Sequence, residues 1–192
     1  MRRVAFRALV AVVGVLALTL LTLVVLVATG TVRGYVIRTS AMEPTLHCAR
    51  PARGCVATRS DRVLALTRLV SFERGDLVVF PASSRGLAEC GVGGNYVKRV
   101  VALPGETVET RLLDGVSHVY IDGKRLDEPY VDDDRRDSAS VKRFTLPPRH
   151  LFVLGDNRAA ACDSRHFGAV PEDDMIGELV VTWWPLDRLA IR

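Results

Sequence analysis

The chain has 192 residues, of which 48% are hydrophobic and 25% are charged, and its formal net charge is +4. A hydrophobic content near the globular average excludes a membrane protein with many spans. Three of the positive charges, at Arg2, Arg3 and Arg7, precede a single apolar run, and the rest of the chain is close to neutral. Because no basic run is interleaved with aromatic residues, we expect no nucleic-acid partner.

The N-terminal apolar run carries no charged residue from Ala8 to Val32. Roughly 20 apolar residues suffice for a helix to cross the hydrocarbon core of a bilayer. A cleaved secretory signal is the alternative, but its apolar region spans only about 7–15 residues, so the run favours an uncleaved anchor. The arginine excess before the run, against Arg33 after it, predicts a cytoplasmic N-terminus. We expect a single-pass protein of the cell membrane, with its anchor in residues 1–32 and an extracytoplasmic domain in residues 33–192.

Short runs of β-branched and apolar residues follow the anchor, and Asp, Gly and Pro separate them. This pattern predicts a mostly β domain with antiparallel strands and no long amphipathic helix. The expected strands are Tyr35–Arg38, Arg62–Thr67, Asp76–Phe80, Tyr96–Leu103, Glu106–Leu112, His118–Ile121, Leu151–Leu154 and Leu179–Trp184. Asp122-Gly123 is typical of a hairpin turn. Residues 82–95, rich in Ser, Gly and Ala, predict a loop.

The acidic stretch 132–138 is expected to be a solvated surface loop. Its three aspartates lack the spacing and the glycine of a known calcium loop. Near the C-terminus, Trp183 and Trp184 have two interpretations. They lie at the level of the lipid headgroups, or they are buried in the core.

The four cysteines allow three disulfide pairings. Cys48 and Cys55 enclose a short loop with Pro51 and Gly54, which could bring their Cα atoms within disulfide reach. No Cys-x-x-Cys or His pair has the spacing of metal ligands, so we expect no metal site. The alternative for each cysteine is a small buried apolar residue.

Lys98 is the candidate for acid–base chemistry, because it lies inside the apolar run Tyr96–Val101. A lysine acts as a general base only if burial lowers the pKa of its ammonium toward neutrality. The alternative is a strand lysine that points into water.

Four segments in chain order carry a resemblance to a known family. They are Arg38–Leu46, Gly75–Pro81, Tyr96–Gly105 and Gly155–Gly168, the last with Gly155-Asp156-Asn157-Arg158 and Asp163-Ser164-Arg165. In order and after an anchor, they resemble the sequence boxes of the type I signal peptidases. These are membrane-anchored serine–lysine endopeptidases, and the resemblance covers most of the domain after the anchor.

The resemblance implies a role for each matched position. Residue 41 stands at the nucleophile position and Lys98 at the general-base position. Thr39 matches a hydroxyl that helps to bind the oxyanion, and Gly155 allows the backbone to approach the lysine. Asp163 and Arg165 match a supporting ion pair. Asp156 and Ser164 match further supporting positions. Positions that contact the substrate are matched by Ile37, Met42 and Pro44.

The resemblance also implies partners. They are the lipid bilayer and the signal peptides of exported preproteins, with small residues at the cleaved end and no cofactor. Ile37 could narrow the pocket that selects those residues, or it packs in the core. The sequence predicts neither the physiological substrates nor an oligomeric state.

Two departures from the family pattern fall where the chemistry should occur. Ala41 replaces the serine nucleophile, and Ala161 replaces a serine that commonly hydrogen-bonds the lysine. We therefore expect the chain to be inactive or severely impaired. The alternatives are a non-catalytic signal-peptide-binding or regulatory module, and a variant of an active enzyme with its nucleophile replaced, against which Ala161 argues.

Neighbouring side chains are weak substitutes for the missing serine. In an extended segment Ser40 would point to the opposite face from residue 41, unless a bulge re-aims it. Thr39 would share the face of residue 41 but be displaced by about 7 Å. An exposed Cys162 thiolate would be nucleophilic, although a disulfide with Cys90 is the simpler expectation. Binding would survive, because an extended peptide could add as a strand beside Ile37, Thr39 and Ala41.

Overall fold

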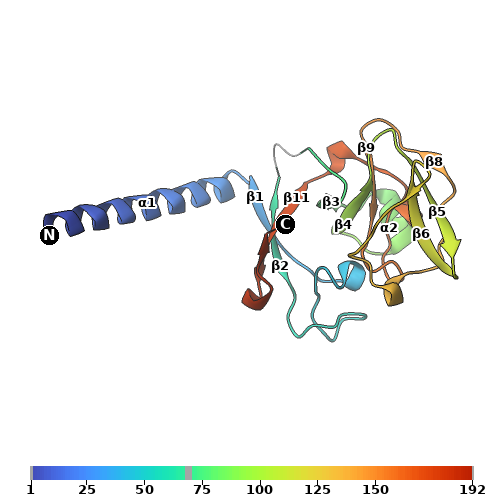
Figure 1. Cartoon of the computed structure of the whole chain (residues 1–192), viewed down its shortest axis with the longest axis horizontal. Coiled ribbons are helices and arrows are strands. Elements are labelled where there is room, and N and C mark those ends of the chain that lie inside the picture. Colours follow the sequence, from blue (N-terminus) through green and yellow to red (C-terminus); the bar gives the residue numbers. More distant parts are fainter. Residues whose placement is uncertain (1, 68–70, 192) are drawn as a thin grey trace.

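The computed structural model describes residues 2–67 and 71–191. Helix α1 (Arg2–Ala28) projects as a rod from a β-rich body (Figure 1). Its segment Leu9–Ala28 has a mean hydropathy of 3.0 and is not buried, so it is long and apolar enough to cross a membrane. The helix ends at Ala28, and the first strand begins at Val32.

Two antiparallel sheets form the body, which confirms the mostly β prediction. The larger has eight strands in the order β1-β2-β11-β3-β4-β9-β10, with β12 paired to β11, and the smaller has the order β7-β6-β5-β8. The strands of the larger sheet are β1 (Val32–Val36), β2 (Arg62–Leu66), β3 (Leu77–Pro81), β4 (Asn95–Ala102), β9 (His150–Leu154), β10 (Val170–Pro171), β11 (Gly177–Trp184) and β12 (Ala190–Ile191). Those of the smaller are β5 (Thr107–Leu113), β6 (Val116–Ile121), β7 (Lys124–Arg125) and β8 (Phe144–Thr145).

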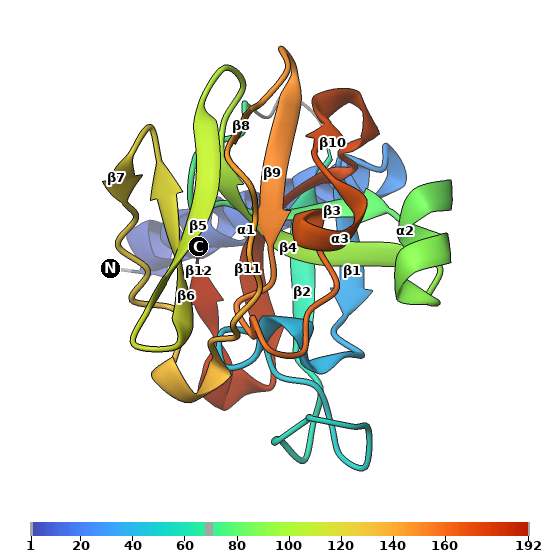
Figure 2. The same cartoon turned by 90° about the vertical axis from the view of Figure 1, so that its right-hand side faces the viewer.

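Short helical turns connect the strands. They are α2 (Ser84–Cys90), α3 (Ser164–Phe167), η1 (Ser40–Met42), η2 (Asp133–Arg135), η3 (Glu172–Asp174) and η4 (Leu186–Arg188). Figure 2 shows the larger sheet with α2 and α3 to one side and the β5–β6 hairpin to the other. Turn Asp122-Gly123 joins β6 to β7, as its sequence predicts.

Three apolar clusters form the core. One lies around β2 and β3 and includes Met42 and Leu46. A second joins the two sheets through Phe152, and a third packs Phe80 and Phe167 against β4. The third cluster forms the apolar surroundings of β4.

Two expected element bounds are wrong. The strand predicted at Tyr35–Arg38 is instead β1, whose ladder with β2 runs from Val32 opposite Leu66 to Val36 opposite Arg62. Pairing with β2, rather than the local β propensity, therefore sets the extent of this strand.

The loop predicted at residues 82–95 contains α2. The Ser83 side chain accepts a hydrogen bond from the Gly86 N–H, and Gly91 ends the helix with a φ of 67°. A serine N-cap and a glycine in the left-handed region are helix-boundary signals, so the residues that suggested a loop are those that delimit a helix.

The acidic stretch is only partly the solvated loop that the sequence predicts. Asp132, Asp133 and Asp134 are exposed, but Asp137 accepts a hydrogen bond from Arg165. The described residues hold no group of three or more His, Cys, Asp or Glu side chains arranged for a metal ion. Trp183 is 38% exposed, with the Arg62 guanidinium 5.7 Å from its ring centroid.

Two disulfides fasten the body. Cys48–Cys55 closes a loop within the chain, with its Cα atoms 5.0 Å apart. Cys90–Cys162 joins the end of α2 to the segment before α3, with its Cα atoms 5.8 Å apart. Because Cys162 is bonded to Cys90, it has no free thiol.

The two disulfides are expected to stabilise the fold unequally. Removing Cys90–Cys162, whose partners are 72 residues apart, should lower the free energy of unfolding by about 4 kcal/mol through loop entropy. Removing Cys48–Cys55, with a separation of 7, should lower it by about 2 kcal/mol. Urea unfolding of the full chain in detergent, with each pair changed to serine, measures both. Equal losses would contradict the loop-entropy argument.

Candidate active site

Lys98 projects from β4 into apolar surroundings. It lies opposite Val78 of β3, and its neighbours on the same face, Tyr96 and Val100, belong to the cluster around Phe80. The side chain is only 4% exposed. Burial removes water from the ammonium, which destabilises the charged form.

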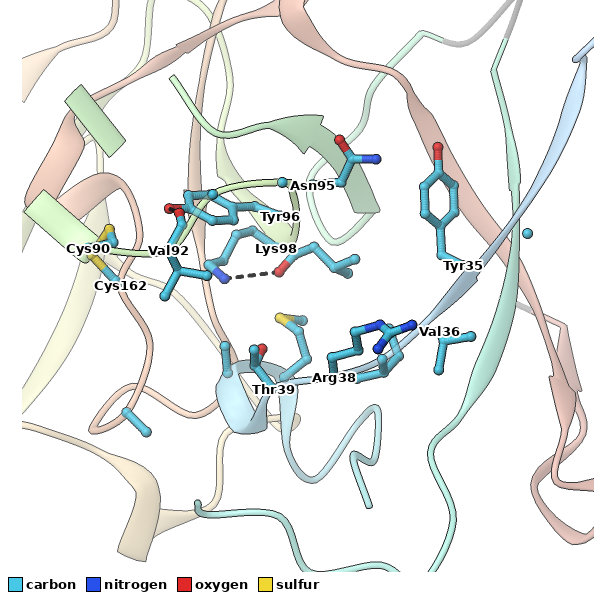
Figure 3. A pocket seen from close by; sticks show the side chains of 18 residues that line it. Tyr35, Val36, Arg38, Thr39, Cys90, Val92, Asn95, Tyr96, Lys98 and Cys162 are labelled. Carbon is cyan, nitrogen blue, oxygen red and sulfur yellow. Dashed lines mark hydrogen bonds between the residues drawn. A yellow bond between two sulfur atoms is a disulfide. The ribbon is translucent and has the colours of Figure 1, made fainter. Parts of the chain in front are cut away.

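The pKa of Lys98 is lowered to about 8, with burial as the largest cause. The carboxylates of Asp163 and Asp156 act in the opposite direction, and the Arg165 guanidinium adds to the lowering. The Lys98 Nζ donates a hydrogen bond of 3.1 Å to the Val97 carbonyl oxygen (Figure 3). Such an amine is neutral in an appreciable fraction of molecules near pH 8, so it can accept a proton.

Ala41 lies in the turn η1, where a backbone clamp holds it. The Asn157 N–H donates to the Ala41 carbonyl oxygen at 3.1 Å. The Asn157 side-chain amide donates to the Ser40 carbonyl oxygen at 3.0 Å. Because η1 is a turn, Ile37, Thr39 and Ala41 do not form one strand face, which corrects the extended segment expected from the sequence.

Gly155 lies between Ala41 and Ala161. A Cβ atom on Gly155 would lie 2.6 Å from the Ala41 carbonyl oxygen and 2.3 Å from the Ala161 Cβ. Neither neighbour is the end of a flexible side chain, so only glycine fits. The segment after β9 therefore packs directly against η1.

Asp163 is the centre of a buried ion-pair network. Its carboxylate accepts from the Gly155 N–H at 3.0 Å and from the Arg165 Nε and Nη2, both at 2.8 Å. Arg165 also donates to the carbonyl oxygens of Arg158 and Ala161. These bonds hold in place the segment from Gly155 to Arg165, part of which lines the same cavity as Lys98.

Asp156, which is fully buried, forms a second ion pair with Arg99, whose side chain is 12% exposed. The Arg99 Nε and Nη2 donate to the two Asp156 oxygens at 2.9 and 2.6 Å. Arg99 also donates to the Gly75 carbonyl oxygen at 2.7 Å, and its guanidinium lies 3.9 Å from the Tyr130 ring centroid. Arg99 therefore fastens β4 to the segment after β9 through Asp156 and to the segment before β3 through Gly75.

Sequence reasoning missed several residues of this framework. Asn157 lies within the fourth of the segments that carry the family resemblance, and its position beside Asp156 was the available signal for a role. Arg158 donates to buried Glu128, which has no such signal because it lies outside the four segments. The support residue Ser164 accepts a hydrogen bond from the Val153 N–H, so it fastens α3 to β9.

A cavity of about 690 Å³ opens beside Lys98. It is lined by residues 34–39, 41 and 42 on one side, by residues 90 and 92–98 on the other, and by residues 160 and 162. Figure 3 shows Thr39 and Lys98 on facing walls, with the Cys90–Cys162 disulfide at one end. The cavity thus brings together Ile37, Thr39, Ala41, Met42 and Lys98.

Of the other residues considered from the sequence, Pro44 and Ser40 lie away from this cavity, whereas Cys162 lines it. Pro44 does not line it, although the sequence suggests a substrate contact. Ser40 is buried with its Oγ 2.6 Å from where a Cβ on Gly54 would lie, so its hydroxyl faces the Cys48–Cys55 loop. Cys162 lines the cavity as half of a disulfide.

Comparison with known proteins identifies the family. A family model described as "Signal peptidase, peptidase S26" matches residues 9–184. The chain belongs to this family. Signal peptidase I of Bacillus caldolyticus is 31% identical over 175 residues, which cover 82% of each chain. Signal peptidase IB of Staphylococcus aureus strain COL is 29% identical over 82% of this chain and 80% of its own.

A signal peptidase I crystal structure from Enterococcus faecalis V583 is also similar. It is 32% identical and covers 58% of this chain and 99% of its own, with a TM-score of 0.43. Serine endopeptidases make up the signal peptidase I family, and they act on the signal peptides of exported preproteins. This membership makes the cavity beside Lys98 the candidate for peptide binding in this signal peptidase homologue.

Proposed function

We propose that this chain is a membrane-anchored signal-peptidase homologue that binds signal peptides of exported preproteins and cleaves them poorly or not at all. The observation that carries the proposal is the buried amine of Lys98 in the same cavity as the methyl group of Ala41. The amine supplies the general base of a serine–lysine dyad, and Ala41 occupies the nucleophile position without an oxygen.

Neighbouring groups support the proposed lack of catalysis. Within residues 2–67 and 71–191, the hydrogen bond found for the Lys98 Nζ goes to a backbone carbonyl and not to a hydroxyl. The Ser40 hydroxyl faces Gly54 and lies outside the cavity lining. The Cys162 sulfur is bonded to Cys90. Neither the Ser40 hydroxyl nor the Cys162 sulfur can act as the nucleophile without rearrangement.

The free edge of β4 supports peptide binding. Residues 95–98 pair with β3 on one side, whereas β9 pairs with β4 only from Arg99 onward. The cavity lies against this unpaired stretch, so an extended peptide can add there as a strand. Ile37 and Met42, both buried, supply apolar contacts for its side chains.

The anchor and the disulfides support an extracytoplasmic placement of residues 33–192. Arg2, Arg3 and Arg7 precede the apolar helix and favour a cytoplasmic N-terminus. Disulfides persist in oxidising compartments outside the cytoplasm. The proposed site therefore faces the compartment in which exported preproteins emerge.

A combined processing and retention assay tests the proposal. The detergent-solubilised chain, immobilised and mixed with a preprotein, should retain it without producing the mature form. Ile37→Asp places a charge against the cavity and should lower retention at least about tenfold. The matched control Val56→Asp, at an exposed position outside the cavity, should retain the preprotein normally. Processing at the rate of an active signal peptidase would refute the loss of catalysis, and absence of retention would refute binding.

A further inference from the structure

The cavity beside Lys98 has an unbalanced charge. Among the described residues that line it are two cationic side chains, Arg38 and Lys98, and no carboxylate. Arg38 is exposed at the rim, whereas Lys98 is buried at the wall. An anion that entered the cavity would meet an ammonium already stripped of most of its water.

The carboxylates nearest to Lys98 are already paired with other cations. Asp163 accepts from two nitrogens of Arg165, and Asp156 accepts from two nitrogens of Arg99. Arg165 also donates to Asp137, so these carboxylates are engaged with guanidinium groups, and no ion pair of Lys98 is found among the described residues. The hydrogen bond of the Lys98 ammonium to the Val97 carbonyl uses one of three N–H donors. Two donors are therefore available to a ligand in the cavity.

The unpaired edge of β4 has an end. A peptide that pairs with residues 95–98 and runs parallel to β4 reaches Lys98 where β9 takes over, at Arg99 opposite Leu154. A peptide chain that continued past this point would have to leave the edge. One that ends there places its terminal carboxylate beside the ammonium, and Ala41 adds no competing acceptor.

We propose that the cavity binds the free C-terminal carboxylate of a peptide that has already been cleaved, such as a released signal peptide, in preference to an uncleaved chain. This inference rests on the proposed peptide-binding function and specifies its ligand. The bond is an ion pair between the peptide carboxylate and Lys98, in surroundings where a charge-assisted hydrogen bond is strong. No covalent step is involved.

The test compares two fluorescent peptides that differ only at the C-terminus. Both carry the same apolar segment and end in Ala-Gln-Ala, one as a free acid and the other as a carboxamide. Fluorescence anisotropy with the full chain in detergent should show the acid bound about tenfold more tightly, or better, at pH 6.5. The preference should disappear by about pH 10, because the ammonium must lose its proton while the peptide carboxylate stays ionised.

The other charged groups around Lys98 do not reproduce this pH dependence. Asp163 and Asp156 are held in ion pairs with Arg165 and Arg99, and Arg38 lies at the exposed rim of the cavity. Burial raises the pKa of Tyr96 above its ordinary value, so its phenol loses a proton at higher pH than Lys98 does. A loss of preference between pH 7 and 10 therefore reports on Lys98.

Two variants assign the effect to one side chain. Lys98→Met should abolish the preference for the acid over the carboxamide, whereas Lys124→Met, at an exposed lysine of β7, should leave that preference intact. If Lys98→Met does not fold, the pH dependence of the unchanged protein decides. Equal binding of both peptides would overturn the carboxylate inference and leave the proposed function standing. If neither peptide binds, both fail, and a preference that survives Lys98→Met would overturn the assignment to Lys98.

Discussion

Ala41→Ser is expected to raise the rate of preprotein cleavage by about three orders of magnitude or more. A serine there would place a hydroxyl in the cavity that Lys98 already lines. The Lys98 amine needs no further change in order to act as a base, because burial has lowered its pKa to about 8. On the proposed function, position 41 is the nucleophile position, so we expect Ala41→Ser to give the largest gain of any single substitution, and a single-turnover assay measures it.

Adding Ala161→Ser to Ala41→Ser should increase the rate further, by about one order of magnitude. Ala161 is buried against Gly155, next to the segment that supports Lys98. Position 161 matches the family serine that hydrogen-bonds the lysine, so we expect a hydroxyl there to orient the amine. Ala159→Ser, at an exposed position outside the cavity, is the matched control and should have no effect.

The pH profile of the Ala41→Ser protein provides an independent check. Only neutral Lys98 accepts the serine proton, so the rate should rise with pH and level off above about 8. Lys98→Met in the same background should abolish the gain. Cleavage that stays at background after Ala41→Ser would mean that the rest of the catalytic arrangement has been lost.

The fold was predictable where the sequence pattern is local. The long apolar helix α1 follows from an uncharged run, and the β class follows from short apolar runs between turn residues. Long-range pairing was not predictable in this way. The extent of β1 depends on β2, some 30 residues later in the chain, and α2 was hidden because its cap residues also occur in loops.

The candidate site was predictable from four segments in order, but its geometry was not. The segments contained Lys98, Ala41 and Gly155, and the structure brings all three together. The turn η1 was unexpected, because its conformation is held by Asn157 from a distant segment. Glu128 was missed because a buried ion pair has no signature in sequence when its partner lies 30 residues away.

Asp163→Ala is expected to lower the free energy of unfolding by roughly 3–5 kcal/mol, because it removes the more deeply buried of the two carboxylates paired with the Arg165 guanidinium and leaves only Asp137. The Asp163 side chain is 0% exposed and that of Arg165 is 4% exposed, so water cannot replace the lost carboxylate. The Gly155 N–H, which donates to Asp163, would also lose its acceptor. Urea unfolding of the full chain in detergent measures the loss.

An exposed ion pair is the matched control for Asp163. Asp173 pairs with Arg149, and both side chains are about seven-tenths exposed, at 72% and 68%. Asp173→Ala should therefore change the free energy of unfolding by less than about 1 kcal/mol. Similar losses in the two variants would show that burial does not set the strength of the Asp163–Arg165 pair.

Asp163→Ala should also alter the chemistry of Lys98. The Asp163 carboxylate raises the pKa of Lys98 against the larger effect of burial, so its removal lowers that pKa further below 8. In the Ala41→Ser background, the pH at which cleavage is half-maximal should move to a lower value. Because loss of folded protein reduces the rate without moving this midpoint, the shift separates the electrostatic effect of Asp163 on the amine from its contribution to stability.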